Sequence, residues 1–117
     1  MLDRLLELFR GRPALIQGAG KLKEGHAKKI DIGDPLAGGK QIVLCRVDGA
    51  LYALDARCPH EGGRIIDGPL VDGKRALCPL HNYKFDPKTG KTEEDRMCKD
   101  ATRYRVRERD GDAEVWT

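Results

Sequence analysis

Two short segments of the chain place a cysteine close to a histidine. The segment "CPH" holds Cys58 and His60 with one residue between them, and "CPLH" holds Cys78 and His81 with two residues between them. The two pairs are separated by 17 residues. Thiolate and imidazole are ligands of zinc ions and of iron–sulfur clusters. The pattern therefore predicts a metal centre built from two loops.

The spacing within each pair favours one kind of metal centre over another. Close ligand pairs of structural zinc sites usually have about two to four intervening residues, so the single residue between Cys58 and His60 suits one tetrahedral ion poorly. A [2Fe–2S] cluster with two cysteines on one iron and two histidines on the other is wider, and the two members of a pair can bind different metals. A zinc-stabilised binding module is the alternative of a different class.

The residues around both pairs resemble the Rieske iron–sulfur family. "CPHEGGRI" carries the paired glycines, Gly63 among them, that follow the first ligand loop in that family, and "CPLHNYKFDPKTG" is similar to its second loop. A proline, Pro59 or Pro79, follows each cysteine. The likeness covers roughly residues 40 to 117. It implies an all-β domain, a Rieske-like antiparallel β-sandwich with a two-loop cluster-binding subdomain.

The resemblance also implies one Rieske-type [2Fe–2S] cluster per chain and a role for each ligand. Cys58 and Cys78 would hold the inner iron, and His60 and His81 the outer iron that accepts an electron. Neutral histidines leave the oxidised cluster uncharged, so reduction is easier than in a cluster with four thiolates. The expected function is one-electron transfer to or within an oxidoreductase, with no catalytic residue in this chain.

Residues next to the ligands predict a potential in the lower half of the Rieske range, which runs from about −150 to +300 mV. High-potential members have a loop disulfide and hydroxyl donors from a serine and a tyrosine. Tyr83 and Phe85 occupy those two positions here, and no extra cysteine pair is present. With Gly63 and Pro79, they form the expected surroundings of the cluster.

The rest of the sequence predicts mainly strands. Asp-Gly pairs at 48–49, 72–73 and 110–111 each lie between β-rich runs and predict three hairpins. Apolar residues at 2, 5, 6 and 9 have helical spacing, and Gly11 and Pro13 end that pattern. We therefore expect a short N-terminal helix in an extension over residues 1–25 and the Rieske domain over residues 26–117.

Four further features have plain structural interpretations. We expect His26 on the surface, Cys45 as a buried apolar thiol and Cys98 in a structural role beside the second loop. Arginines at 103, 105, 107 and 109 alternate along one strand and should form a solvated face.

Composition limits the partners and the compartment. The 22 basic and 19 acidic residues are mixed and give a net charge of +3, which is too little to argue for nucleic acid. No apolar run reaches the length of a membrane span, and the start lacks a signal peptide pattern, so we expect no membrane partner and a cytoplasmic location.

The expected partner is a redox protein that docks through Glu61 and Asn82 beside the histidines. Asn82, Tyr83 and Lys84 resemble the small subunit of NADH-dependent nitrite reductases, which would pair this chain with a sirohaem-containing large subunit. The alternative is the ferredoxin component of a ring-hydroxylating oxygenase system, where a separate reductase supplies electrons.

Overall fold

The computed structural model describes residues 13–33, 38–59, 62–93 and 99–117. The expected helix over residues 2–9, the ligand candidate His60, its neighbour Glu61 and Cys98 lie outside these ranges. Among the residues described, no helix is long and apolar enough to cross a membrane.

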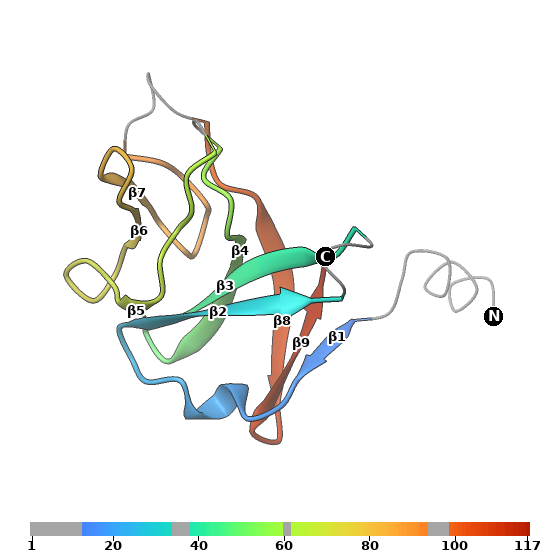
Figure 1. Ribbon diagram of the computed structural model, residues 1–117. Coiled ribbons are helices and arrows are strands. Elements are labelled where there is room, and N and C mark those ends of the chain that lie inside the picture. The colour runs from blue at the N-terminus through green and yellow to red at the C-terminus, as the bar shows by residue number, and fades with distance from the viewer. Residues whose placement is uncertain (1–12, 34–37, 60–61, 94–98) are drawn as a thin grey trace.

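The described chain forms one seven-stranded antiparallel sheet and a separate two-stranded sheet (Figure 1). The large sheet curls, with strand order β1-β9-β8-β4-β3-β2-β5, and the small one pairs β6 with β7. The expected all-β antiparallel class is confirmed. The strands are β1 (Ala14–Ile16), β2 (His26–Ile32), β3 (Lys40–Val47), β4 (Ala50–Asp55), β5 (Gly68–Pro69), β6 (Ala76–Cys78), β7 (Tyr83–Phe85), β8 (Arg103–Arg109) and β9 (Asp112–Trp116), with a 3₁₀ turn η1 at Ala19–Lys21.

Two of the three predicted hairpins are confirmed with the turn chemistry that the sequence indicates. Asp48 and Gly49 connect β3 to β4 with φ of 51° and 80°, and Asp110 and Gly111 connect β8 to β9 with φ of 53° and 82°. Two consecutive positive φ values define the hairpin turn that favours Asp-Gly.

The third Asp-Gly pair makes a tight turn without a long hairpin. Asp72 and Gly73 also have positive φ, but only one bridge, Val71 to Arg75, closes the turn. The flanking segments pair elsewhere, β5 with β2 and β6 with β7. A turn signal predicts a local reversal, whereas the partner of each strand depends on distant residues.

The core lies on both faces of β3. Val43, Cys45 and Val47 contribute to a cluster that continues into the ligand loops, whereas Ile42 and Leu44 contribute to a second cluster inside the curl of the sheet. Alternation along a strand explains this division, because neighbouring side chains point to opposite faces.

The features expected to be structural behave largely as predicted. Cys45 is fully buried, and burial raises the pKa of its thiol to about 12, so it remains protonated. The alternating arginines of β8 are exposed. His26, which was expected on the surface, is half-buried at the start of β2.

The chain joins the sheet earlier than the sequence division at residue 25 suggests. Ala14–Ile16 forms β1 and pairs with Ala113–Val115 of β9. A strand of three residues is too short to show an alternating pattern, so the sequence gives it no signal. Residues 14–16 therefore belong to the sheet. The existence of a separate N-terminal extension stays a proposal for the residues before them.

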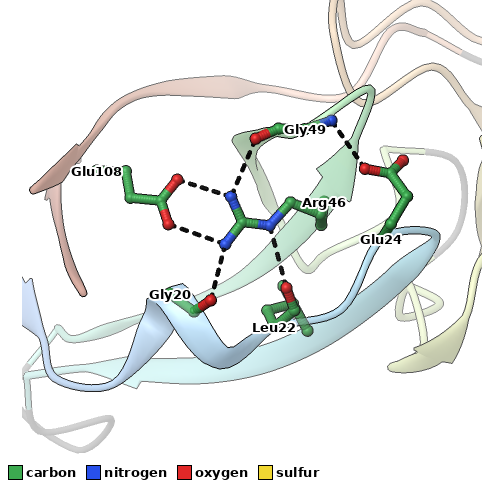
Figure 2. Close-up of polar contacts among 6 residues, drawn as sticks. All are labelled: Gly20, Leu22, Glu24, Arg46, Gly49 and Glu108. Carbon is green, nitrogen blue, oxygen red and sulfur yellow. Dashed lines mark hydrogen bonds and ion pairs between the residues drawn. The ribbon is translucent and has the colours of Figure 1, made fainter.

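Hydrogen bonds from the Arg46 side chain connect three parts of the chain (Figure 2). Its guanidinium makes two hydrogen bonds to the Glu108 carboxylate on β8, of 2.6 and 2.9 Å, and donates to the carbonyl oxygens of Gly20, Leu22 and Gly49. Glu24 accepts hydrogen bonds from the adjacent turn, from the backbone of Gly49 and its neighbour. The β3–β4 turn, η1 and β8 are therefore held together by one buried arginine.

We expect Arg46→Met to lower the free energy of unfolding by about 2 to 3 kcal/mol, because a buried charge pair loses one partner while Glu108 keeps some access to water. The measurement is urea unfolding, with the exposed Arg107→Met as control. Arg46 holds the pKa of Glu108 below its ordinary value. This stabilisation is therefore present above the ordinary pKa of glutamate and disappears as the pH falls through the folded-state pKa. An equal loss in both variants would contradict this account.

Candidate metal centre

The first predicted ligand loop leaves the end of β4 and returns beside it. Cys58 is buried, and its backbone N–H donates to the carbonyl oxygen of Gly63 at 2.8 Å. The N–H of Ile65 donates to the carbonyl of Ala56, also at 2.8 Å. These two bonds close the loop at its base and fix the direction of the Cys58 side chain.

A buried carboxylate supports the entry to this loop. Asp55 accepts hydrogen bonds from the Tyr104 hydroxyl at 2.8 Å and from the backbone N–H of Arg57 at 2.8 Å. Burial acts to raise the pKa of Asp55, but the hydrogen bonds from Arg57 and Tyr104 outweigh it and hold the pKa below its ordinary value. Sequence reasoning missed this group, because its partner Tyr104 lies 49 positions away.

The second predicted ligand loop is the turn of the β6–β7 hairpin. Cys78 is opposite Tyr83 in the register, so Pro79, Leu80, His81 and Asn82 form the turn between them. Asn82 has φ of 57°, in the left-handed region that asparagine tolerates better than most residues. Asn82 therefore shapes the turn through its backbone, in addition to any contact with a partner.

The two loops meet at Gly63. A Cβ atom added there would lie 2.6 Å from the sulfur of Cys78, closer than such atoms approach. Gly63 has no positive φ, so its lack of a side chain serves the close approach and not the backbone conformation. The sequence-based prediction placed Gly63 near the site, but not in contact with this sulfur.

The two cysteines are free thiols, and Cys58 lies close enough to Cys78 to affect it. Burial raises the pKa of the Cys78 thiol and the nearby Cys58 raises it further, while a hydrogen bond from the backbone N–H of Leu80 acts to lower it. A backbone N–H directed at sulfur stabilises a thiolate, which is the form that binds metal.

The imidazole of His81 is exposed to solvent, whereas the thiols of Cys58 and Cys78 are buried. His81 is exposed, with its ring centroid 5.6 Å from that of the half-buried Tyr83. Phe85, two residues further along β7, is fully buried in the core cluster that contains both cysteines. The site thus has an apolar, buried thiol side and an open imidazole side.

Leu80 is the residue of this turn that sequence reasoning overlooked. Its side chain is 53% exposed, next to His81, and its Cβ lies 3.1 Å from the Cβ position of Gly63. An apolar residue in a short run is easily taken for a core residue, and only the turn geometry shows that it faces solvent.

The structure describes three of the four predicted ligands, and they come from two adjoining loops at one end of the sheet. Within the described ranges, no group of three or more His, Cys, Asp and Glu side chains is arranged to hold a metal ion. Fold and site together define an all-β domain in which two adjoining loops carry Cys58, Cys78 and His81.

Comparison with known proteins identifies the family. The Rieske [2Fe-2S] domain profile matches residues 14–105, so the chain belongs to the Rieske [2Fe-2S] domain family. A Ralstonia protein, the "ferredoxin component" of naphthalene 1,2-dioxygenase/salicylate 5-hydroxylase systems, is 41% identical over 69 residues, which cover 59% of this chain and 65% of that protein. The chain thus spans just under two thirds of this relative.

Two solved structures have the same fold. The ferredoxin of carbazole 1,9a-dioxygenase from Nocardioides aromaticivorans has a TM-score of 0.74 at 22% identity, with 90% of this chain and 97% of that chain covered. A Mycobacterium tuberculosis protein described as a NADH-dependent nitrite reductase small subunit has a TM-score of 0.62 at 21% identity, with 88% and 94% covered.

The cofactor that the family implies is a Rieske-type [2Fe–2S] cluster, and the residues present fit it. Two free buried thiols approach one another from separate loops, Gly63 leaves room at one sulfur, and a backbone N–H points to that sulfur. At Cys45, by contrast, burial is the one cause of the raised thiol pKa, and no second thiol or backbone N–H contributes to it.

Proposed function

We propose that this protein is a one-electron carrier whose cluster is held by Cys58 and Cys78 on one iron and by His60 and His81 on the other. A bound Rieske-type cluster would supply reversible one-electron chemistry. The observation that carries the proposal is the division of the site into buried thiols and an exposed imidazole.

That division suits the task of a carrier. Buried Cys58 and Cys78, packed with Phe85, keep water from the sulfur side of the site. Exposed His81 offers a short path to a partner without any movement of the fold. The potential in the lower half of the Rieske range stays a prediction, supported by Phe85, which has no hydroxyl to donate to sulfur.

The comparisons favour one of the two expected systems. The 41% identical relative is a dioxygenase-system ferredoxin component, and the nitrite reductase subunit is related by fold alone. We therefore propose a ferredoxin of a ring-hydroxylating oxygenase system, in place of the nitrite-reductase pairing that Asn82, Tyr83 and Lys84 suggested. A cytoplasmic location is also a proposal, supported by the free thiols Cys45, Cys58 and Cys78.

Purification of the native protein separates the two systems. A monomer that is reduced by a separate flavoprotein and oxidised by a terminal oxygenase is the result we expect. Co-purification with a large polypeptide that contains sirohaem and flavin would support the nitrite reductase alternative instead.

The docking surface should centre on the turn of the β6–β7 hairpin. We expect Leu80→Asp to slow electron transfer to the partner about tenfold, because an exposed apolar side chain beside His81 would be covered in the encounter complex. Stopped-flow oxidation of the reduced protein measures this rate. Leu15→Asp is the matched control, because Leu15 is 60% exposed but lies on β1, away from β6 and β7 (Figure 1).

The polar members of this surface should have smaller effects. Substitution of Glu61 should change the rate and its dependence on salt, since charges at the rim of an interface act on encounter. Substitution of the neutral Asn82 should change the rate alone. Rates that are indifferent to Leu80, Glu61 and Asn82 alike would show that the partner docks elsewhere.

A further inference from the structure

Lys29 of β2 lies on the face of the sheet that carries the core cluster of the ligand loops. It is opposite Val43 in the register with β3, and directly opposed residues of an antiparallel pair point to the same face. Val43 is fully buried in the cluster that also contains Cys58 and Cys78. Ala27, two positions before Lys29 on the same strand, belongs to that cluster as well. The half-buried Lys29 therefore extends toward the thiol side of the site.

The positive charge of Lys29 acts on one of the two thiols. Burial raises the pKa of the Cys78 thiol most strongly, and the ammonium group of Lys29 acts in the opposite direction through space. In the part of the chain that the structure describes, no carboxylate forms an ion pair with Lys29. Its charge is therefore not neutralised by an ion pair, and partial burial weakens the screening of that charge by water.

A charge of the opposite sign lies at the base of the first ligand loop. Asp55 is 6% exposed and, together with Cys58, lines a hollow of about 280 Å³ beside that loop. Hydrogen bonds from the Tyr104 hydroxyl and from Arg57 hold the carboxylate in its ionised form. The side chain of Arg57 is 68% exposed, so water screens its compensating charge more than it screens the charge of Asp55.

Charges at these two places matter for a site that accepts an electron. Reduction adds one negative charge to a cluster bound by Cys58 and Cys78. A nearby positive charge stabilises the reduced form, and a nearby negative charge destabilises it. Both effects are larger for buried groups than for surface groups, because the interior has a lower effective dielectric constant. The direction of each effect therefore follows from the sign of the charge.

We propose that two charged side chains outside the ligand set, Lys29 and Asp55, shift the reduction potential of this protein in opposite directions. Lys29 raises the potential from the side of the second ligand loop, and Asp55 lowers it from the base of the first. Tyr104 acts through Asp55, because its hydroxyl holds the carboxylate in place. The proposal rests on the proposed electron-carrier function and adds to it the residues that adjust the potential.

Spectroelectrochemical titration of the purified, iron-containing protein tests the proposal. Lys29→Gln should lower the midpoint potential, and Asp55→Asn should raise it. Lys29→Arg keeps the charge and should keep a potential near that of the wild type. Lys28→Gln is the matched control, because it removes the same charge from the neighbouring position of β2. Lys28 is exposed and opposite Leu44, on the other face of the sheet. Its shift should be a small fraction of the Lys29 shift, because water screens an exposed charge.

A second control separates the charge of Asp55 from its hydrogen bonds. Tyr104→Phe removes a donor but leaves the carboxylate, so the potential should stay unchanged or fall, whereas Asp55→Asn should raise it. Iron content is measured first for every variant. If Lys29→Gln binds no iron, Lys29→Met, which has a similar length and no charge, takes its place. If Asp55→Asn does not retain iron, the Lys29 variants decide the proposal.

An unchanged or higher potential in Lys29→Gln would overturn the proposal, and so would an equal shift in Lys28→Gln. An unchanged or lower potential in iron-containing Asp55→Asn would also overturn it. A rise of the same size in Tyr104→Phe would assign the effect to loop structure and not to charge. Failure of the electron-carrier proposal has a different signature, because the wild-type protein would then show no reversible one-electron couple at all.

Discussion

Replacement of Cys78 by serine should abolish the visible absorbance of the protein completely. The hydroxyl of serine is a poor substitute for a thiolate, and Cys78 is the residue at which Gly63 and the Leu80 N–H converge. Because metal binding is coupled to folding, the β6–β7 turn should also become protease-sensitive. Iron content and absorbance of the purified variant measure the first effect, and limited proteolysis measures the second. Cys58→Ser should behave in the same way.

Cys45→Ser provides the matched control, because Cys45 is also a buried free cysteine in the same core cluster. We expect it to keep the spectrum and to lose only stability, from the burial of a hydroxyl. Cys98→Ser should also keep the spectrum. Loss of the cluster in either control, or its retention in Cys78→Ser, would show that the ligand set is wrong.

Gly63→Ala should cost nearly all of the bound iron. The added methyl group would lie 2.6 Å from the sulfur of Cys78, so either the sulfur or the first ligand loop must move. Either movement displaces a thiolate from its metal, and ligand geometry has little tolerance for such a shift. Iron per chain after purification is the measurement, and the remaining apoprotein can be followed by circular dichroism.

The neighbouring Gly62 separates a steric effect from a backbone effect. Gly62 has φ of 74°, and a Cβ added there would meet nothing within 4 Å. Gly62→Ala should therefore cost about 1 kcal/mol of stability through the left-handed backbone but leave the iron content intact. Equal iron loss in both variants would mean that the loop backbone, and not contact with the sulfur, requires glycine.

The sequence predicted those parts of the fold that depend on local chemistry. The Asp-Gly pairs at 48–49 and 110–111 identified two hairpins, because positive φ at both positions is required there. The spacing of Cys58, Cys78 and His81 identified the two loops that the structure brings together. In each case a few neighbouring residues carry the whole signal.

The parts that the sequence did not predict depend on contacts between distant residues. Arg46 and Glu108 are 62 positions apart, and neither differs in type from the many exposed charges of the chain. The role of Gly63 depends on where Cys78 lies in space. Leu80 looks like a core residue until the hairpin turn places it outside. Strand β1 is recognisable only through its pairing with β9.

Metal analysis of the purified protein, combined with EPR of the dithionite-reduced sample, tests the central claim most directly. We predict two irons and two acid-labile sulfides per chain, a red-brown colour and an average g value below that of the free electron, as mixed cysteine and histidine ligation implies. Stoichiometric zinc with no visible absorbance would contradict the account and would instead support a zinc-stabilised binding module.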